Sequence, residues 1–155
     1  MILGATDGEI SLTNGAGITV QQVETTPGHN NKFVVNFPNG VQTTFEWQTV
    51  LPDNFVGTTV TPTIMWDTTD AGADTVDWGF QAVAVPATGS TDVAFGAAQE
   101  VSSTNAGANE ENDATTAAVT IGGTPAAGNK VFFKLYRKAT GTLASVARMM
   151  FVVLR

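Results

Sequence analysis

The sequence predicts an all-β protein, an antiparallel β-sandwich that is jelly-roll-like and has an N-terminal arm or hairpin. Three observations support this fold class. Apolar side chains fall on every second position in much of residues 58–86, which is the period of a strand with one buried face. Gly, Thr, Ala and Val are abundant while Leu, Lys and Glu are scarce, a composition typical of strands and turns. No long segment spaces its apolar residues by the 3.6 positions of a helical turn.

Residues 58–86 are predicted to form a central hairpin. Its inward-facing side chains would be Val60, Ile64 and Trp66 in the first strand and Val76, Trp78 and Phe80 in the second. The intervening loop, DTTDAGAD, is small and polar, and it is too short for a parallel crossover. The two strands are therefore expected to pair antiparallel and to carry two tryptophans into one core.

Residues 1–45 are predicted to form an arm or short strands, and residues 46–155 a β-sandwich domain. Residues 1–28 carry few charges and six candidate interface side chains, Ile2, Leu3, Ile10, Leu12, Ile18 and Val20. This segment could form an edge hairpin of the same domain, or an arm that reaches a neighbouring subunit. The stretches KFVVNF and VQTTFEW are predicted to form a hairpin around Asn39 and Gly40, because both residues tolerate a positive φ.

The rest of the chain alternates between loops and strands. Residues 87–116 are small and polar and are predicted to form a loop. A short strand is expected at 117–123 and a longer one at 130–138. The last segment, SVARMMFVVLR, is apolar on both faces, so we expect a central strand that is covered on each side. The predicted core consists of Val60, Ile64, Trp66, Val76, Trp78, Phe80, Val131, Phe133, Leu135, Met150 and Val152.

Composition excludes several classes of function. The chain has no cysteine and a single histidine, His29, which excludes thiolate chemistry and argues against a nucleophilic triad or a zinc site. The net charge of −7 argues against binding to nucleic acid or to a membrane. No secretory leader or membrane-spanning stretch is expected. Six of the seven cations lie from residue 130 onward, so the charge divides either into two solvated faces or into complementary surfaces of two subunits.

No catalytic or cofactor-binding site is expected, so the chain is predicted not to be an enzyme. The carboxylates Asp67, Asp70 and Asp74 are candidate calcium ligands, although turn chemistry alone also accounts for aspartates in this loop. Trp66 and Trp78 alternate in phase with aliphatic residues and are assigned to the core. Trp47 ends a strand and is the tryptophan most free to face outward, where it could stack on a sugar ring.

Residues 51–155 resemble small structural proteins of tailed bacteriophages. The resemblance lies in LPDNFVGTTVTPTIMWD, in DTVDWGFQAVAV, and in GNKVFFKLYRKATGTLASVARMMFVVLR. The final strand pair of that pattern contains Gly128, Asn129, Val131, Leu135 and Arg137, with Asn129 standing where the pattern often has Asp.

The resemblance implies a non-enzymatic virion component, a capsid decoration, head-fibre or tail-tip jelly roll that assembles in the host cytoplasm. Such a protein would be a homotrimer bound to the major capsid protein or to another virion protein. The alternative is a receptor- or carbohydrate-binding module of a tail tip or adhesin. Exposed aromatic side chains at one loop end would favour the binding module, whereas burial of all three tryptophans would favour the shell protein.

Overall fold

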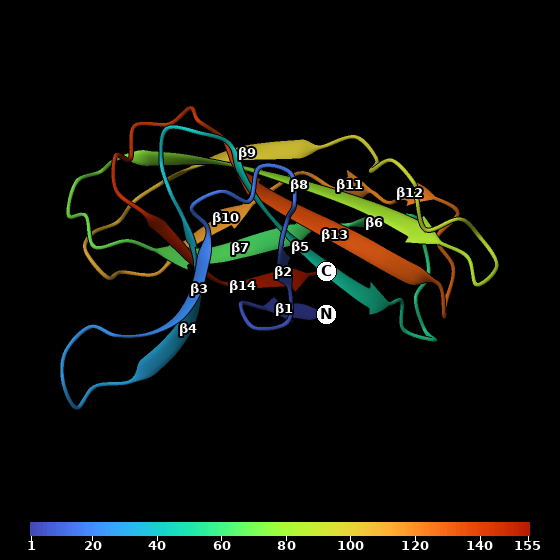
Figure 1. Ribbon diagram of the computed structural model, residues 1–155, viewed down its shortest axis with the longest axis horizontal. Helices are drawn as coiled ribbons and strands as arrows, with labels where there is room; N and C mark the ends of the chain where they lie inside the picture. The colour runs from blue at the N-terminus through green and yellow to red at the C-terminus, as the bar shows by residue number, and fades with distance from the viewer.

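The computed structural model describes all 155 residues, which form two β-sheets packed face to face (Figure 1). The first sheet has the order β10 (Asn112–Thr115), β7 (Pro62–Asp67), β14 (Ala147–Leu154), β4 (Asn31–Phe37) and β3 (Thr19–Glu24), and β1 (Ile2–Gly4) also pairs with β14. The second sheet has the order β12 (Gly122–Gly123), β8 (Thr75–Val85), β13 (Lys130–Arg137), β5 (Thr43–Val50) and β2 (Glu9–Ile10), and β9 (Gln99–Thr104) also pairs with β8. A short third sheet joins β6 (Thr59–Val60) to β11 (Val119–Thr120). All pairs are antiparallel except β12 with β8, so the predicted antiparallel sandwich is confirmed.

The predicted central hairpin is wrong in its pairing. The two strands form, but β7 pairs with β14 and β10 in the first sheet, whereas β8 pairs with β13 and β9 in the second. The loop between them crosses from one sheet to the other. Period-two alternation identifies the buried face of a strand but not its neighbour. Trp66 and Trp78 consequently meet across the interior, with ring centroids 6.1 Å apart.

The same correction applies to the predicted hairpin around Asn39 and Gly40. Strand β4 lies in the first sheet and β5 in the second, and β4 instead forms a hairpin with β3. Gly40 has a φ of 88°, as a turn requires, but this turn connects the two layers of the sandwich.

The N-terminal segment belongs to the sandwich. β1 pairs with β14, β2 with β5 and β3 with β4, and the expected boundary at residues 45 and 46 falls inside β5. Residues 1–28 therefore belong to their own domain, as one alternative held, but they form separate strands in both sheets and not the expected edge hairpin. The region predicted as a loop, 87–116, also contains β9 and β10, because polar and small residues suffice for strands with a solvent-facing side.

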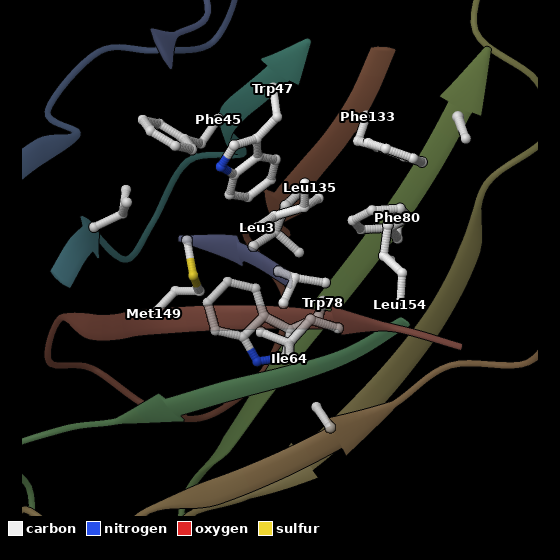
Figure 2. Packing of buried hydrophobic residues seen from close by; sticks show 14 of the residues in the cluster. Leu3, Phe45, Trp47, Ile64, Trp78, Phe80, Phe133, Leu135, Met149 and Leu154 are labelled. Atoms are coloured by element: carbon white, nitrogen blue, oxygen red, sulfur yellow. The ribbon is translucent and has the colours of Figure 1, made fainter. Parts of the chain in front are cut away.

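Every residue predicted for the core is buried. All of them except Met150 belong to one cluster between the sheets, and Figure 2 shows part of it, with Phe80, Phe133 and Leu135 of the second sheet facing Ile64 and Leu154 of the first. Strand β14 is central as predicted, and its outer face is partly covered, since Arg148 and Met150 are buried and Val153 is half-buried. Phe151 is the exception, at 46% exposure beside an irregularity between Met149 and Phe151. No helix in the structure is long and apolar enough to cross a bilayer.

Candidate functional site

All three tryptophans are buried, which corrects the expectation for Trp47. Its side chain is only 2% exposed, and its Nε1 donates a hydrogen bond of 2.9 Å to the carbonyl oxygen of Gly4. Gly4, which accepts this hydrogen bond, belongs to β1 and lies more than 40 positions earlier in the chain. The burial of Trp47 could not be read from the local pattern, because the covering strand is distant in sequence.

The candidate calcium ligands are not assembled into a metal site. Asp67 is buried and forms ion pairs with Lys32 and with Arg148, whose Nε lies 2.7 Å from Asp67 Oδ1. Asp70 Oδ1 accepts a hydrogen bond of 2.9 Å from the backbone N–H of Gly72, which is the expected turn chemistry. No group of three or more acidic or histidine side chains in the chain, Asp74 included, could hold a metal ion. The only histidine, His29, lies exposed in the turn of the β3–β4 hairpin.

Most cations are paired with acids of the same chain. Lys138 Nζ lies 2.7 Å from Glu100 Oε2, and Lys134 Nζ lies 3.5 Å from Glu46 Oε1. Together with the ion pair of Asp67 and Arg148, these contacts join the basic end of the sequence to its acidic part within one subunit. Three of the six C-terminal cations are thus engaged within the subunit, while eleven of the fourteen acids form no ion pair.

Arg137, which carries part of the phage resemblance, has a structural position. Its guanidinium is fully buried and donates to the carbonyl oxygens of Phe37, Leu143 and Ser145. Burial lowers the pKa of Arg137 to about 10, so the group remains charged at neutral pH. It holds the loop before β14 against the end of β4.

The largest hollow of the molecule, about 690 Å³, is a groove on the outer face of the second sheet. Its floor is a row of polar side chains from three neighbouring strands, Glu46 of β5, Lys134 of β13 and Gln81 of β8, which the strand register places side by side. These side chains point away from the core because inward and outward positions alternate along each strand.

Two segments form the walls of this groove. On one side lie β2 and the following residues, with Glu9, Ile10 and the fully exposed Leu12. On the other side lies the loop after β8, with Val93 and Phe95. The groove thus combines carboxylate, amide and ammonium groups on its floor with apolar walls.

Two contacts fix the Phe95 wall to the floor. Lys134 Nζ lies 4.0 Å from the centroid of the Phe95 ring, and Gln81 Nε2 donates a hydrogen bond of 2.8 Å to the carbonyl oxygen of Gly96. A cation over a ring and a side-chain to backbone bond both restrict the loop. The wall is therefore held in place in the unliganded chain, which lowers the ordering cost of binding.

A second polar cluster continues along the same face. The Tyr136 ring lies over Gly79, and its hydroxyl donates a hydrogen bond of 2.8 Å to Glu100 Oε1. Burial and this bond raise the pKa of Tyr136 above its usual value. Hydrogen bonds from Lys138 and Tyr136 lower the pKa of Glu100. A hollow of about 250 Å³ lies beside this cluster, lined by Asp77, Glu100 and Lys138 among others.

The six candidate interface residues divide between core and surface. Leu3 and Ile18 are buried in the core of their own chain, while Ile2, Ile10, Leu12 and Val20 are exposed. Ile10 and Leu12 line the groove. Sequence reasoning missed the floor residues Glu46, Gln81 and Lys134, although each is a polar residue that alternates with apolar ones on a predicted strand.

Comparison with known proteins shows similarity in fold alone. No family model and no curated protein matches the sequence. The carbohydrate-binding module CBM36 in complex with calcium and xylotriose has a TM-score of 0.51 at 12% identity, covering 100% of this chain and 99% of that one. CBM35 from Paenibacillus barcinonensis has a TM-score of 0.52 at 14% identity, covering 100% and 98%.

A third similar structure belongs to a larger protein. The cycloisomaltooligosaccharide glucanotransferase of Paenibacillus sp., complexed with cycloisomaltoheptaose, has a TM-score of 0.57 at 10% identity over 99% of this chain. The match covers only 18% of that enzyme. These likenesses establish the β-sandwich architecture of the chain.

Proposed function

We propose that this chain is a non-catalytic glycan-binding module and that the groove on the second sheet is its binding surface. The observation that carries the proposal is the row formed by Glu46, Lys134 and Gln81 between the apolar walls of Leu12 and Phe95. A sugar ring presents hydroxyl groups, which need donors and acceptors, and C–H faces, which pack on apolar side chains. The groove offers both, in the arrangement usual for ligand sites with a few oriented polar groups.

The charges of the groove favour a neutral glycan. Glu9 and Glu46 both line it, and the one lysine, Lys134, is already engaged by Glu46 and by the Phe95 ring. The chain as a whole carries a net charge of −7. Uronic acid or sulfate groups would meet repulsion on approach. The sandwich fold shared with carbohydrate-binding modules agrees with the proposal.

Titration calorimetry with neutral xylo-, gluco- and galacto-oligosaccharides, followed by a wider array of neutral glycans, tests this function. We expect binding that weakens about tenfold or more in Phe95→Ala, since stacking and wall contacts of an aromatic ring contribute about 1–3 kcal/mol. Phe33→Ala is the matched control, because Phe33 is an exposed phenylalanine of the first sheet. Absence of binding to every neutral glycan, or equal loss in both variants, would refute the proposal.

A virion shell protein is the second candidate function. The observation that favours it is the burial of all three tryptophans, which leaves the groove with phenylalanine as its only aromatic side chain. A shell protein of this kind would form trimers and bind a capsid protein. A trimeric solution mass, with a major capsid gene beside the gene for this chain, would favour the shell protein. A soluble monomer or dimer that binds glycans would favour the module.

A further inference from the structure

The β3–β4 hairpin projects from the sandwich. Within β4, only Val35–Phe37 pairs with β14, so the preceding residues pair with β3 alone. Figure 1 shows this hairpin extending away from the two sheets, with the 25–30 turn at its tip. A two-stranded ribbon without a third strand is marginally stable in water. Apart from the buried Val34 and the ion pair of Lys32 with Asp67, the distal hairpin has little of the packing that stabilises the rest of the fold.

The outer edge of β3 is open along its whole length. All its residues are exposed except Val23, which is half-buried. β3 pairs with β4 only, without a register shift, and no loop hydrogen bond reaches its backbone. An open edge presents a row of unpaired N–H and C=O groups to other chains.

The usual protections against edge pairing are missing from β3. Its sequence, TVQQVE, contains no Lys and no Pro, and nothing covers it. Its single charge, Glu24, is at the end of the strand, where Oε1 accepts a hydrogen bond of 2.9 Å from the N–H of Gly28. By contrast, the outer strands β9 and β10 have a carboxylate at an interior position, and β2 and β12 are only two residues long.

We propose that β3 pairs antiparallel with β3 of a second copy of this chain, related by a two-fold axis normal to the sheet. Such an axis passes midway between a residue of β3 and the same residue of the partner, which then lie opposite each other. The register with the longest overlap therefore centres on Gln21 or on Gln22. In these registers Glu24 lies opposite Ile18 or Val20, and no like charges meet. The strand is thus compatible in charge with its own copy.

Pairing would remove the instability of the projecting hairpin. In the dimer, the strands would follow the order β4, β3, β3 of the partner and β4 of the partner. This four-stranded ribbon exceeds the three strands needed for independent stability. Val20 and Phe33, 40% and 52% exposed in the single chain, lie on this hairpin and would gain neighbours. The interface lies away from the groove of the second sheet, so the proposal does not depend on glycan binding.

Sedimentation velocity of the full chain over a range of concentrations tests the proposal. We expect a reversible monomer–dimer equilibrium, and we expect a double variant, Gln21→Lys with Gln22→Lys, to stay monomeric because edge lysines oppose pairing. Both glutamines are exposed, so the substitutions should leave the thermal midpoint of the monomer nearly unchanged. Gln48→Lys is the control, since it makes the same change at an exposed position of the second sheet.

Amide hydrogen exchange of the wild-type chain gives an independent readout if the double variant folds poorly. Alternate amides of β3, those directed outward, should gain protection as the concentration rises, while the groove strands should not change. The proposal is overturned by a monomer at every concentration, by a trimer, by a dimer that survives the double lysine variant, or by β3 amides whose exchange is independent of concentration.

Discussion

Replacing Trp47 by Phe should destabilise the fold more than replacing Trp78 by Phe. Both rings are buried, at 2% and 0% exposure, and both substitutions remove the same atoms, so the cavity and transfer costs are comparable. The indole N–H groups differ. Trp47 Nε1 donates to the Gly4 carbonyl oxygen at 2.9 Å, whereas Trp78 Nε1 has no hydrogen-bond partner.

The size of the difference follows from the hydrogen bond. Trp47→Phe removes the shorter of two hydrogen bonds that the Gly4 carbonyl oxygen accepts, the other coming from the Asp7 N–H at 3.3 Å, and the lost bond is worth about 0.5–1.5 kcal/mol. Trp78→Phe gives up no hydrogen bond and removes a buried, unpaired donor, so part of its cavity cost is offset. We therefore expect the free energy of unfolding of Trp47→Phe to lie about 1 kcal/mol or more below that of Trp78→Phe.

Urea unfolding followed by circular dichroism measures both variants against the wild type. The slope of free energy against urea should be the same for all three proteins, so that the midpoints report stability. Trp66→Phe is a useful third variant. Its Nε1 donates to Ser103 Oγ at 3.1 Å, and a hydroxyl can turn to another partner, so its cost should be intermediate. Equal costs for Trp47→Phe and Trp78→Phe, or the reverse order, would refute the reasoning.

Three further predictions concern charge and close packing. Asp67→Ala should cost about 3–5 kcal/mol in urea unfolding, because it leaves the buried Arg148 without its carboxylate; an unchanged midpoint would contradict this. Gly79→Ala should cost about 1–3 kcal/mol, because a Cβ there would overlap the Tyr136 ring; the loss should shrink when Tyr136→Ala is added. The lowered pKa of Glu100 should contribute stability above the unfolded-state pKa of 4.5, and that contribution should be lost as the pH falls through the folded-state pKa. Because Glu100 is largely exposed, the effect should stay below about 1 kcal/mol; a Glu100→Gln variant should show a flatter stability profile in acid, and an identical profile would count against the cluster.

The candidate site was only partly predictable from the sequence. The outward position of Lys134 follows from its alternation with Val131, Phe133 and Leu135, which are all buried. Phe95 could not be assigned, because it lies in a polar segment without periodicity. Its place above Lys134 depends on the path of the whole loop after β8.

The sequence by itself determined the secondary-structure class, the buried faces and the core. Those features depend on side-chain alternation, which is local and has the fixed period of a strand. Trp66, Trp78 and Phe133 could be assigned to the interior for that reason.

Only the tertiary structure decided which strands pair and which residues cover one another. Alternation is the same whether β7 meets β8 within one sheet or faces it across the core, so the pairing depends on long-range contacts that no short segment encodes. The burial of Trp47 by β1 and the pairing of Asp67 with Arg148 join residues 43 and 81 positions apart. The projection of the β3–β4 hairpin likewise arises because β14 pairs with β4 along only part of its length and with β1 beyond that part.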